Sequence, residues 1–283
     1  MMIVLTKADD LRAHISSARR NGEKIGFVPT MGALHEGHLS LIKDARRETG
    51  QTVCSIFVNP AQFNDPNDYK KYPVTISKDI QLLELSGTSV LFLPEVEEIY
   101  PTGHTGLEQY DLGFLESVLE GKYRPGHFQG VCQVMARLLR IVQPDDLFMG
   151  QKDYQQCMVV KKLLQLTGMD NTRFHVCATV REPDGLAMSS RNLRLNAQDR
   201  KTAATISVAL RMVKEKLQPG DLSKLVEEAK SMLADKQFKT DYFEIADANS
   251  LEPVQHWDGS RHLVALVAAF LGEVRLIDNM VVS

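Results

Sequence analysis

Two histidines near the amino terminus have the spacing expected of an anion-binding loop. Residues 29–38 read PTMGALHEGH, between an apolar, strand-like run and a helix-like run. At a helix start, the free backbone N–H groups and the helix dipole attract phosphate, and the imidazoles of His35 and His38 can donate to the same oxyanion. Gly32 and Gly37 allow close approach of a bulky anion. The alternative is that one histidine only caps the helix and the other is exposed; the position between strand and helix favours the anion site.

Other chemistries for this loop are weaker. The phosphate-binding patterns G-x-x-x-x-G-K-S/T and G-x-G-x-x-G are both missing from the sequence. Zinc at His35 and His38 is disfavoured because no third ligand lies nearby in the sequence. We therefore predict no metal ligand from the protein here.

A second stretch, FMGQKDYQQ at residues 148–156, also lies between a predicted strand and a predicted helix. Lys152 could neutralise phosphate, Asp153 could accept hydrogen bonds from ribose hydroxyls, and Gly150 would let a flat ring or a sugar lie against the backbone. The alternative is a solvated charge pair at a helix start.

A third stretch, AMSSR at residues 187–191, follows a turn. The hydroxyls of Ser189 and Ser190 and the guanidinium of Arg191 suit a polyphosphate, although short Ser-Ser-Arg strings are common in loops. Together the three stretches predict one nucleotide site far more specifically than any one of them does.

These stretches need a scaffold that brings them to one edge. The first half of the chain alternates β-branched runs with amphipathic, charged runs, which is typical of strands joined by crossover helices. We expect strands at residues 25–29, 52–58, 90–93 and 146–149, and helices at residues 39–48, 77–85, 131–142 and 154–167. The pattern predicts a doubly wound, Rossmann-like α/β domain whose ligand site lies at the carboxyl ends of the strands.

After the turn signal at Pro183 and Asp184-Gly185 the pattern changes. We expect helices at residues 197–217 and 222–234, then strands at 242–246, 263–270 and 274–278. Two domains are predicted: a nucleotide- and substrate-binding domain over residues 1–180, and a smaller α+β domain over residues 181–283 that covers the nucleotide.

Composition narrows the partners and the compartment. The chain has 283 residues, with 33 Lys and Arg against 36 Asp and Glu, a net charge of -3, and no long basic run. We expect neither nucleic acid nor a membrane surface as partner. The apolar run at residues 263–271 is too short to span a bilayer, and nothing reads as a signal peptide, so we expect a cytoplasmic protein. The cysteines at positions 54, 132, 157 and 177 are predicted to be reduced core thiols.

Several blocks of sequence, taken in order, resemble one family nearly from end to end. They are FVPTMGALHEGH, SIFVNPAQF, YRPGHFQGV, GQKDYQQ, REPDGLAMSSRN and the closing RLIDN. The chain resembles the pantothenate synthetases, the pantoate–β-alanine ligases of the nucleotidylyltransferase superfamily with an H-x-G-H loop.

The resemblance implies a two-step reaction. The pantoate carboxylate attacks the α-phosphorus of ATP to give pantoyl adenylate and pyrophosphate, and the β-alanine amine then displaces AMP to form pantothenate. It also implies Mg²⁺ bound with ATP and a homodimer formed through the larger domain.

The resemblance also implies residue roles. His38, His35 and Lys152 are the catalytic candidates, with His38 first. Pantoate and β-alanine would contact Pro29, Thr30, Met31, Gln62 and Gln156. ATP would contact Met31, Gly32, His35, His38, Gly150, Gln151, Lys152, Asp153, Val180, Met188, Ser189, Ser190 and Arg191.

One position departs from the family pattern, because Gln151 stands where Glu usually precedes Lys-Asp; a detail of nucleotide or metal contact is in doubt. His127 could serve structure or function equally. Asp79 could reach magnesium, but we expect it to be solvated on an exposed helix face.

A nucleotidylyltransferase that leaves the nucleotide on its product is the alternative enzyme, and a nucleotide sensor without turnover is a weaker alternative. A tRNA synthetase is disfavoured by the near-neutral charge.

Overall fold

A six-stranded parallel sheet forms the larger domain. The computed structural model describes residues 1–64, 66–103 and 106–283. The strand order is β1-β4-β3-β2-β5-β6, and every neighbouring pair is parallel. The strands are β1 Ile3–Leu5, β2 Ile25–Thr30, β3 Gln51–Ile56, β4 Val90–Phe92, β5 Asp146–Gly150 and β6 Arg173–Cys177.

Helices cover both faces of this sheet because its central strands are apolar on both sides. Phe27 of β2 packs into the core with α1, α7 and α8, whereas the next residue, Val28, packs into the core with α2 and α4. These helices are α1 Ala8–Arg20, α2 Glu36–Glu48, α4 Ile76–Leu85, α7 His127–Val142 and α8 Tyr154–Leu166. The short elements between them are η1 Pro60–Gln62, α3 Pro66–Lys70, α5 Val96–Ile99, η2 Gly113–Glu116, α6 Leu119–Tyr123 and η3 Gln151–Asp153.

The strand order reverses between β2 and β5. From β2 the chain moves outward through β3 and β4, and it later crosses back to place β5 on the other side of β2. Ligands of doubly wound sheets bind in the crevice that such a reversal opens at the carboxyl ends of the strands. The histidine loop follows β2 and the Lys152 segment follows β5, so both lie at this crevice.

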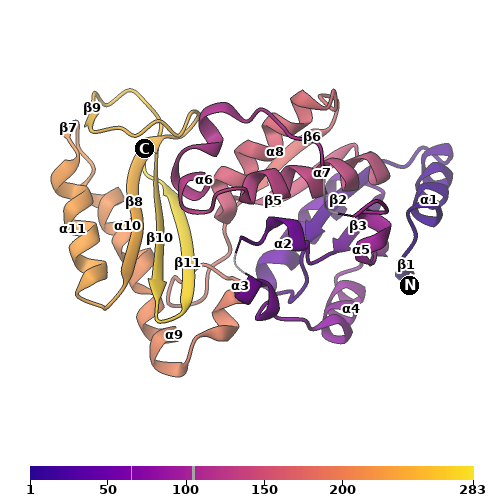
Figure 1. Cartoon of the computed structure of the whole chain (residues 1–283), viewed down its shortest axis with the longest axis horizontal. Helices are drawn as coiled ribbons and strands as arrows, with labels where there is room; N and C mark the ends of the chain where they lie inside the picture. Colours follow the sequence, from indigo (N-terminus) through magenta and orange to yellow (C-terminus); the bar gives the residue numbers. More distant parts are fainter. Residues whose placement is uncertain (65, 104–105) are drawn as a thin grey trace.

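A three-stranded antiparallel sheet, in the order β11-β10-β8, forms the second part of the chain. Figure 1 shows α10 and α11 on its outer side and the larger domain on the other. β10 is almost wholly buried because its two faces belong to two hydrophobic cores. The elements are η4 Ser190–Arg194, α9 Ala197–Ala203, α10 Thr205–Lys216, β7 Gly220–Asp221, α11 Ser223–Ala234, β8 Lys239–Asp247, β9 His256–Trp257, β10 Leu263–Leu271 and β11 Val274–Val281.

The predicted fold class is confirmed, with differences in detail. The predicted helix at residues 131–142 begins earlier, at His127, and the one predicted at 197–217 is interrupted at Ala204. The edge strands β1 and β6 were not predicted. All four cysteines are free and buried. In the described ranges no helix is both long and apolar enough to cross a membrane.

Candidate functional site

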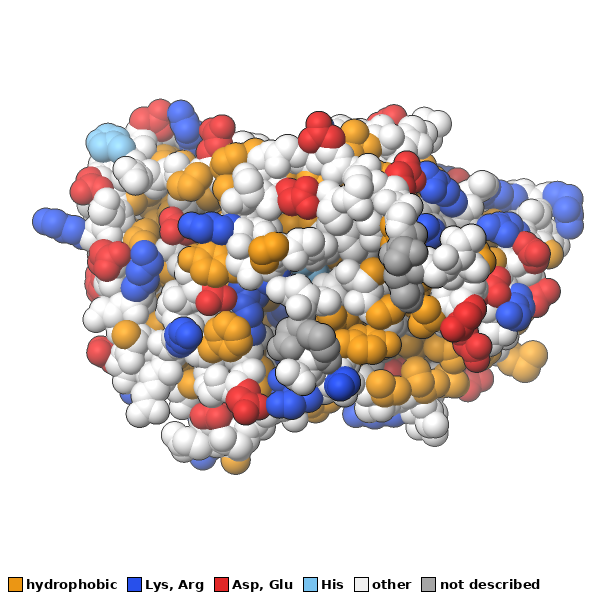
Figure 2. Space-filling model, viewed as in Figure 1, with side chains coloured by type: hydrophobic (Ala, Val, Ile, Leu, Met, Phe, Trp, Pro, Cys, Tyr) orange, Lys and Arg blue, Asp and Glu red, His pale blue; other side chains and the backbone are white. Residues whose placement is uncertain are grey.

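Two adjoining cavities lie where the strand order reverses. The inner cavity, of about 200 Å³, is bounded by β2, the start of α2 and the apolar face of α7. The outer cavity, of about 680 Å³, lies between the larger domain and the three-stranded sheet. On the face of the molecule drawn in Figure 2, Lys and Arg side chains lie near the centre. Residues common to both linings are Met31, Gln62, Lys152, Asp153, Gln156, Ser189 and Arg191.

The structure brings the three predicted stretches to the inner cavity. The predicted site residues that line it are Pro29, Thr30, Met31, His35, His38, Gln62, Gly150, Lys152, Asp153, Gln156, Val180, Met188, Ser189, Ser190 and Arg191. Gly32 and Gln151 line neither of the two cavities. The roles of the individual residues stay predictions.

The histidine loop has a strained backbone that a buried carboxylate holds. Gly32 and Ala33 have φ of 80° and 48°, in the left-handed region where only glycine is at ease. Asp79 of α4 is fully buried, and its two oxygens accept hydrogen bonds at 2.9 Å from the N–H groups of Ala33 and Leu34. Thr75 donates to the same carboxylate at 3.0 Å.

The prediction that Asp79 is solvated on an exposed helix face was wrong. Its carboxylate is directed at the backbone of a loop about 45 residues earlier in the chain. Both carboxylate oxygens accept hydrogen bonds there, so Asp79 stabilises the loop and does not contact solvent. Charged oxygens suit this place because two N–H groups of a tight turn point at them.

Both histidines cap the helix that they begin. Nδ1 of His35 accepts a hydrogen bond from the Gly37 N–H at 3.2 Å, and Nδ1 of His38 accepts one from the His35 N–H at 3.3 Å. The ring centroids are 4.1 Å apart. Because each Nδ1 is an acceptor, the proton of each neutral ring sits on Nε2, which leaves one N–H donor per ring for a ligand. Capping and ligand binding are therefore compatible roles.

Burial keeps both rings neutral. It lowers the pKa of His35 to about 4, with the Lys152 charge adding to the effect. It also lowers the pKa of His38 well below 6.5, again assisted by the neighbouring His35 and Lys152. Gly37 is required for this packing, because a Cβ there would lie 2.9 Å from the His35 ring. Near neutral pH both rings are therefore uncharged, and each carries one N–H group.

The segment with Lys152 is held in place by the last strand. Asn279 of β11 is buried, and its side-chain amide donates to the carbonyls of Gln151 and Lys152 at 2.9 and 2.8 Å. The Gln151 side chain returns a 3.3 Å hydrogen bond to Asn279, which turns it toward the second sheet. Sequence reasoning missed Asn279; its one signal was the closing RLIDN block, which by itself names no role.

The serine segment divides its groups between the loop and the cavity. The Ser190 hydroxyl is buried and donates to the Ala33 carbonyl at 3.0 Å, so it ties this segment to the histidine loop. The Ser189 oxygen accepts from the Arg191 N–H at 3.3 Å, and Ser189 lines both cavities. Arg191 does not reach freely into the outer cavity, because Asp68 pairs with it at 2.8 Å.

The apolar end of the inner cavity carries two amides. Gln62 of η1 and Gln156 of α8 line it beside the buried side chains of Phe57, Val134 and Met135. The Gln62 amide nitrogen donates to the Met31 sulfur, a weak acceptor, at 2.9 Å, and its oxygen accepts a hydrogen bond from the Asn59 amide at 3.2 Å. The apolar residues from α7 escaped sequence reasoning because they read as ordinary core.

His127 is buried at the start of α7, and its contacts favour a structural role. Its Nδ1 lies 2.8 Å from the Gln62 carbonyl and its Nε2 lies 3.1 Å from the Arg124 guanidinium. The carbonyl accepts and the arginine donates, so the ring is neutral with its proton on Nδ1. Burial and then the Arg124 charge lower its pKa to about 3. This ring fixes the backbone at Gln62.

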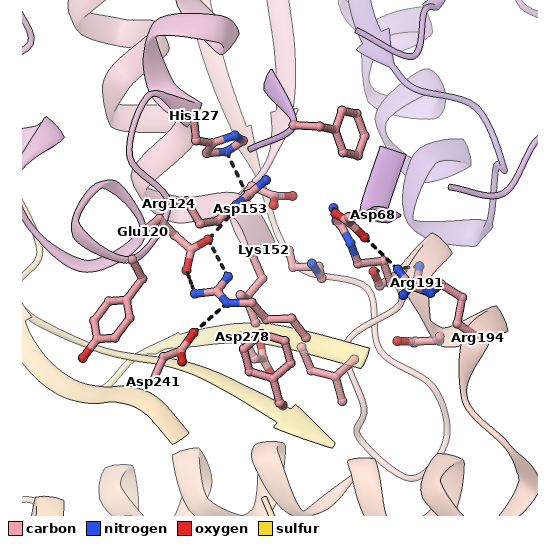
Figure 3. Close-up of a pocket in the computed structure, with 18 of the residues that line it drawn as sticks. Asp68, Glu120, Arg124, His127, Lys152, Asp153, Arg191, Arg194, Asp241 and Asp278 are labelled. Carbon is pink, nitrogen blue, oxygen red and sulfur yellow. Dashed lines mark hydrogen bonds and ion pairs between the residues drawn. The ribbon is translucent and has the colours of Figure 1, made fainter. Parts of the chain in front are cut away.

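A charged cluster joins the two sheets along one wall of the outer cavity. Figure 3 shows Glu120 and Arg124 on this wall; Glu120 pairs with Arg275 of β11 at 2.7 Å and with Arg124 at 3.6 Å. Tyr242 donates a hydrogen bond to Glu120 at 2.9 Å. Burial alone would raise the pKa of Glu120, but the Arg275 guanidinium lowers it to about 2. Arg275 also pairs with Asp241 at 2.8 Å, so these charges are balanced within the wall.

Comparison with known proteins gives a consistent result. The family model described as pantoate-beta-alanine ligase matches residues 3–281. A pantothenate synthetase of Bacteroides thetaiotaomicron is 45% identical over 99% of this chain and 98% of its own length. One from Bacteroides fragilis is 43% identical over 99% and 98%.

Solved structures agree with these relatives. The pantothenate synthetase of Thermus thermophilus has a TM-score of 0.91 at 41% identity, over 99% of both chains. The pantoate-beta-alanine ligase of Francisella tularensis, solved with beta-gamma ATP and beta-alanine, has a TM-score of 0.82 at 38% identity, over 99% of this chain and 98% of that one.

Replacing Asp79 with Asn tests the loop support. An amide nitrogen would face a backbone N–H, so one charge-assisted hydrogen bond is lost and a donor is left unpaired. We expect the free energy of unfolding, measured with urea, to fall by about 2 to 3 kcal/mol. The control Asp9→Asn, at an exposed ion pair of α1, should change it by less than about 0.5 kcal/mol. An Asp79→Asn protein as stable as the control would contradict the account.

The buried histidines predict a pH dependence of stability. His35 and His127 have pKa values of about 4 and about 3 when folded, below the ordinary 6.5. At a pH between the folded pKa and the unfolded pKa, the unfolded chain binds more protons than the folded chain. The free energy of unfolding should therefore fall as the pH drops from about 6.5 toward 4. His127→Asn, which keeps a donor for the Gln62 carbonyl, should reduce this slope by up to about 1.4 kcal/mol per pH unit. The measurement is the free energy of unfolding in urea at pH 7, 6 and 5 for both proteins. If this free energy changes equally with pH in the wild type and in the His127→Asn protein, the assignment is refuted.

Proposed function

The chain belongs to the pantoate–β-alanine ligase family, and on that premise we propose how its two cavities divide the reaction. The enzyme condenses pantoate with β-alanine in an ATP-dependent reaction that forms pantothenate, AMP and pyrophosphate. The inner cavity holds pantoate, the nucleoside and the α-phosphate, and the outer cavity receives the β- and γ-phosphates and then β-alanine. The observation that carries this proposal is the meeting of the histidine loop, the Lys152 segment and the serine segment at one cavity.

The chemistry requires activation of a carboxylate. A carboxylate does not react with an amine at neutral pH, because its leaving group would be oxide. In the first step a pantoate oxygen attacks the α-phosphorus, and the bond to pyrophosphate breaks. In the second step the β-alanine amine, having lost a proton, attacks the acyl carbon and displaces AMP. The protein must hold two anions together while charge builds on the α-phosphate, so positioning and electrostatics carry the rate.

Neutral histidines and one lysine suit this task. The Nε2–H donors of His35 and His38 would meet phosphate oxygens as charge develops there, while their Nδ1 atoms stay on the backbone. Lys152 lines both cavities and would neutralise the phosphate that passes between them. Ser189 and Arg191 would hold the outer phosphates, and Ser190 would keep their segment against the histidine loop.

Pantoate fits the amide-bearing end of the inner cavity. Gln62 and Gln156 can hydrogen-bond the hydroxyls and the carboxylate, and the apolar wall from α7 can receive the dimethyl carbon. Neutral amides fix these oxygens without adding charge beside the reacting carboxylate. An analogue that lacks a hydroxyl would leave an amide unpaired, which permits strong discrimination.

Magnesium is compatible with the residues present, provided that substrate carries most of the coordination. Among the residues that the structure describes, no group of three or more His, Cys, Asp or Glu could hold a metal. Mg²⁺ commonly binds through phosphates, water and one or two carboxylates, and Asp153 lines both cavities. We propose that Asp153 faces an ion held chiefly by ATP. When bound, this ion would offset phosphate charge.

We also propose a cytoplasmic homodimer with domains at residues 1–180 and 181–283. The requirement for ATP and four free, buried cysteines support a reducing compartment. β1 and β6 are the edge strands of the larger sheet, and Val176 on β6 is an exposed apolar side chain. Light scattering during gel filtration would give the oligomeric state.

His38→Ala should keep the fold and reduce pantoate-dependent pyrophosphate release at least about a hundredfold, because one preorganised donor to the phosphate is lost. The control is His256→Ala on β9, an exposed position that lines neither of the two cavities. Near-normal turnover of the His38 variant would remove this imidazole from catalysis.

The reaction itself predicts a pattern of products. With ATP, Mg²⁺ and pantoate alone, pyrophosphate should appear in an amount limited to about one equivalent of enzyme unless the adenylate leaves. Adding β-alanine should start turnover that yields AMP, pyrophosphate and pantothenate in equal amounts, measured by chromatography. Pyrophosphate without free AMP in the complete mixture would instead indicate transfer of the nucleotide to a product.

A further inference from the structure

The two arginines of η4 already bind an anion that belongs to the protein. The Asp68 carboxylate of α3 lies 2.8 Å from the Arg191 guanidinium and 2.7 Å from that of Arg194, one oxygen to each (Figure 3). Its side chain is only 24% exposed and the arginines 23% and 18%, so the three groups meet in a half-buried place. All three line the outer cavity with Lys152 and Ser189.

This carboxylate is ionised as well as placed. Burial would raise the pKa of Asp68, but the hydrogen bonds and charges of Arg191 and Arg194 outweigh burial and lower it. Arg191 also stands over the Tyr72 ring, with its guanidinium carbon 5.8 Å from the ring centroid. A carboxylate and a phosphate present oxygens to a guanidinium in the same geometry, so they compete for the same N–H donors.

The other cations of the outer cavity are arranged differently. Arg275 and Arg124 are balanced by Glu120 and Asp241 within one wall. Lys152 has no ion-pair partner among the described residues. Arg191 and Arg194 share the single charge of Asp68, and Figure 3 shows this group across the cavity from the Glu120 wall. A phosphate chain that extends from Lys152 toward η4 would therefore meet two arginines and one carboxylate.

We propose that Asp68 is an internal competitor of the phosphate chain, which weakens the binding of ATP and of pyrophosphate by occupying Arg191 and Arg194. The carboxylate must give up at least one guanidinium when the phosphates arrive, and it returns as pyrophosphate leaves. This inference rests on the proposed function, because it takes the outer cavity as the phosphate site. Its consequence is faster release of pyrophosphate, at the expense of affinity.

Calorimetric titration of the full-length protein with pyrophosphate, with and without Mg²⁺, tests the proposal without turnover. Asp68→Asn keeps the size of the side chain and removes the competing charge. We expect its dissociation constant for pyrophosphate to fall about three- to fivefold, the upper part of the range for a partly exposed ion pair. Product inhibition by pyrophosphate in the complete reaction should tighten by the same factor. Asp68→Ala, checked for folding by thermal unfolding, should give the same direction.

Glu273→Gln is the matched control. Glu273 is a rim carboxylate of the same cavity that pairs with Lys71 at 2.8 Å, so its loss makes the same charge change without freeing either arginine. Its dissociation constant should stay within about twofold of the wild-type value.

Other results would overturn the inference. Weaker pyrophosphate binding by both Asp68 variants would mean that Asp68 orients the arginines for phosphate. Unchanged binding would mean that Asp68 does not compete with pyrophosphate. If the dissociation constant falls equally in the Asp68 and Glu273 variants, the effect comes only from the loss of one negative charge near the cavity. If the wild type and every variant fail to bind pyrophosphate and ATP, the phosphate site itself is wrong, and the proposed function fails with it.

Discussion

The site depends on one type of hydrogen bond, in which a backbone N–H group donates to Nδ1 of each histidine ring. At the start of α2, two N–H groups are left without helical partners, and the Nδ1 atoms of His35 and His38 accept them. This fixes the tautomer, leaves the Nε2–H group of each ring outside the caps and, with burial, keeps the rings neutral. An imidazolium would break the caps, so the helix start and the donor geometry are a single arrangement. Asp79 completes it by holding the strained turn that delivers His35.

Convergence on the site follows from topology and from a long-range clasp. β2 and β5 are neighbours although more than a hundred residues separate them, so two loops meet at the crevice where the strand order reverses. The second part of the chain then adds Asn279 of β11, which holds the backbone of the Lys152 segment, and Ser190 of η4, which binds the Ala33 carbonyl. The cavity is therefore built jointly by both parts of the chain. Neither part alone provides the full set of donors.

Sequence patterns predicted the features that are local. The alternation of strands and helices gave the parallel sheet, and the histidine loop was placed correctly between strand and helix. The role of Asp79 could not be read, because a carboxylate on an amphipathic helix looks solvated until the packing of α4 against the loop is known. The pair of Asp68 with Arg191 joins residues 123 positions apart, and no periodicity reports such a contact. Asn279 was hidden for the same reason, at the end of an ordinary apolar strand.

The hydrogen bonds from Asn279 of β11 to the Lys152 segment also determine when this segment becomes fixed during synthesis of the chain. Asn279 emerges from the ribosome 127 residues after the carbonyl that it binds, when the larger sheet has all its strands. Domains generally fold as they are made, from the amino terminus onward. A nascent chain would thus present a finished parallel sheet with its lysine segment still unsecured. The contact that secures the Lys152 segment therefore forms only after β11, one of the last strands to be translated, has joined the second sheet.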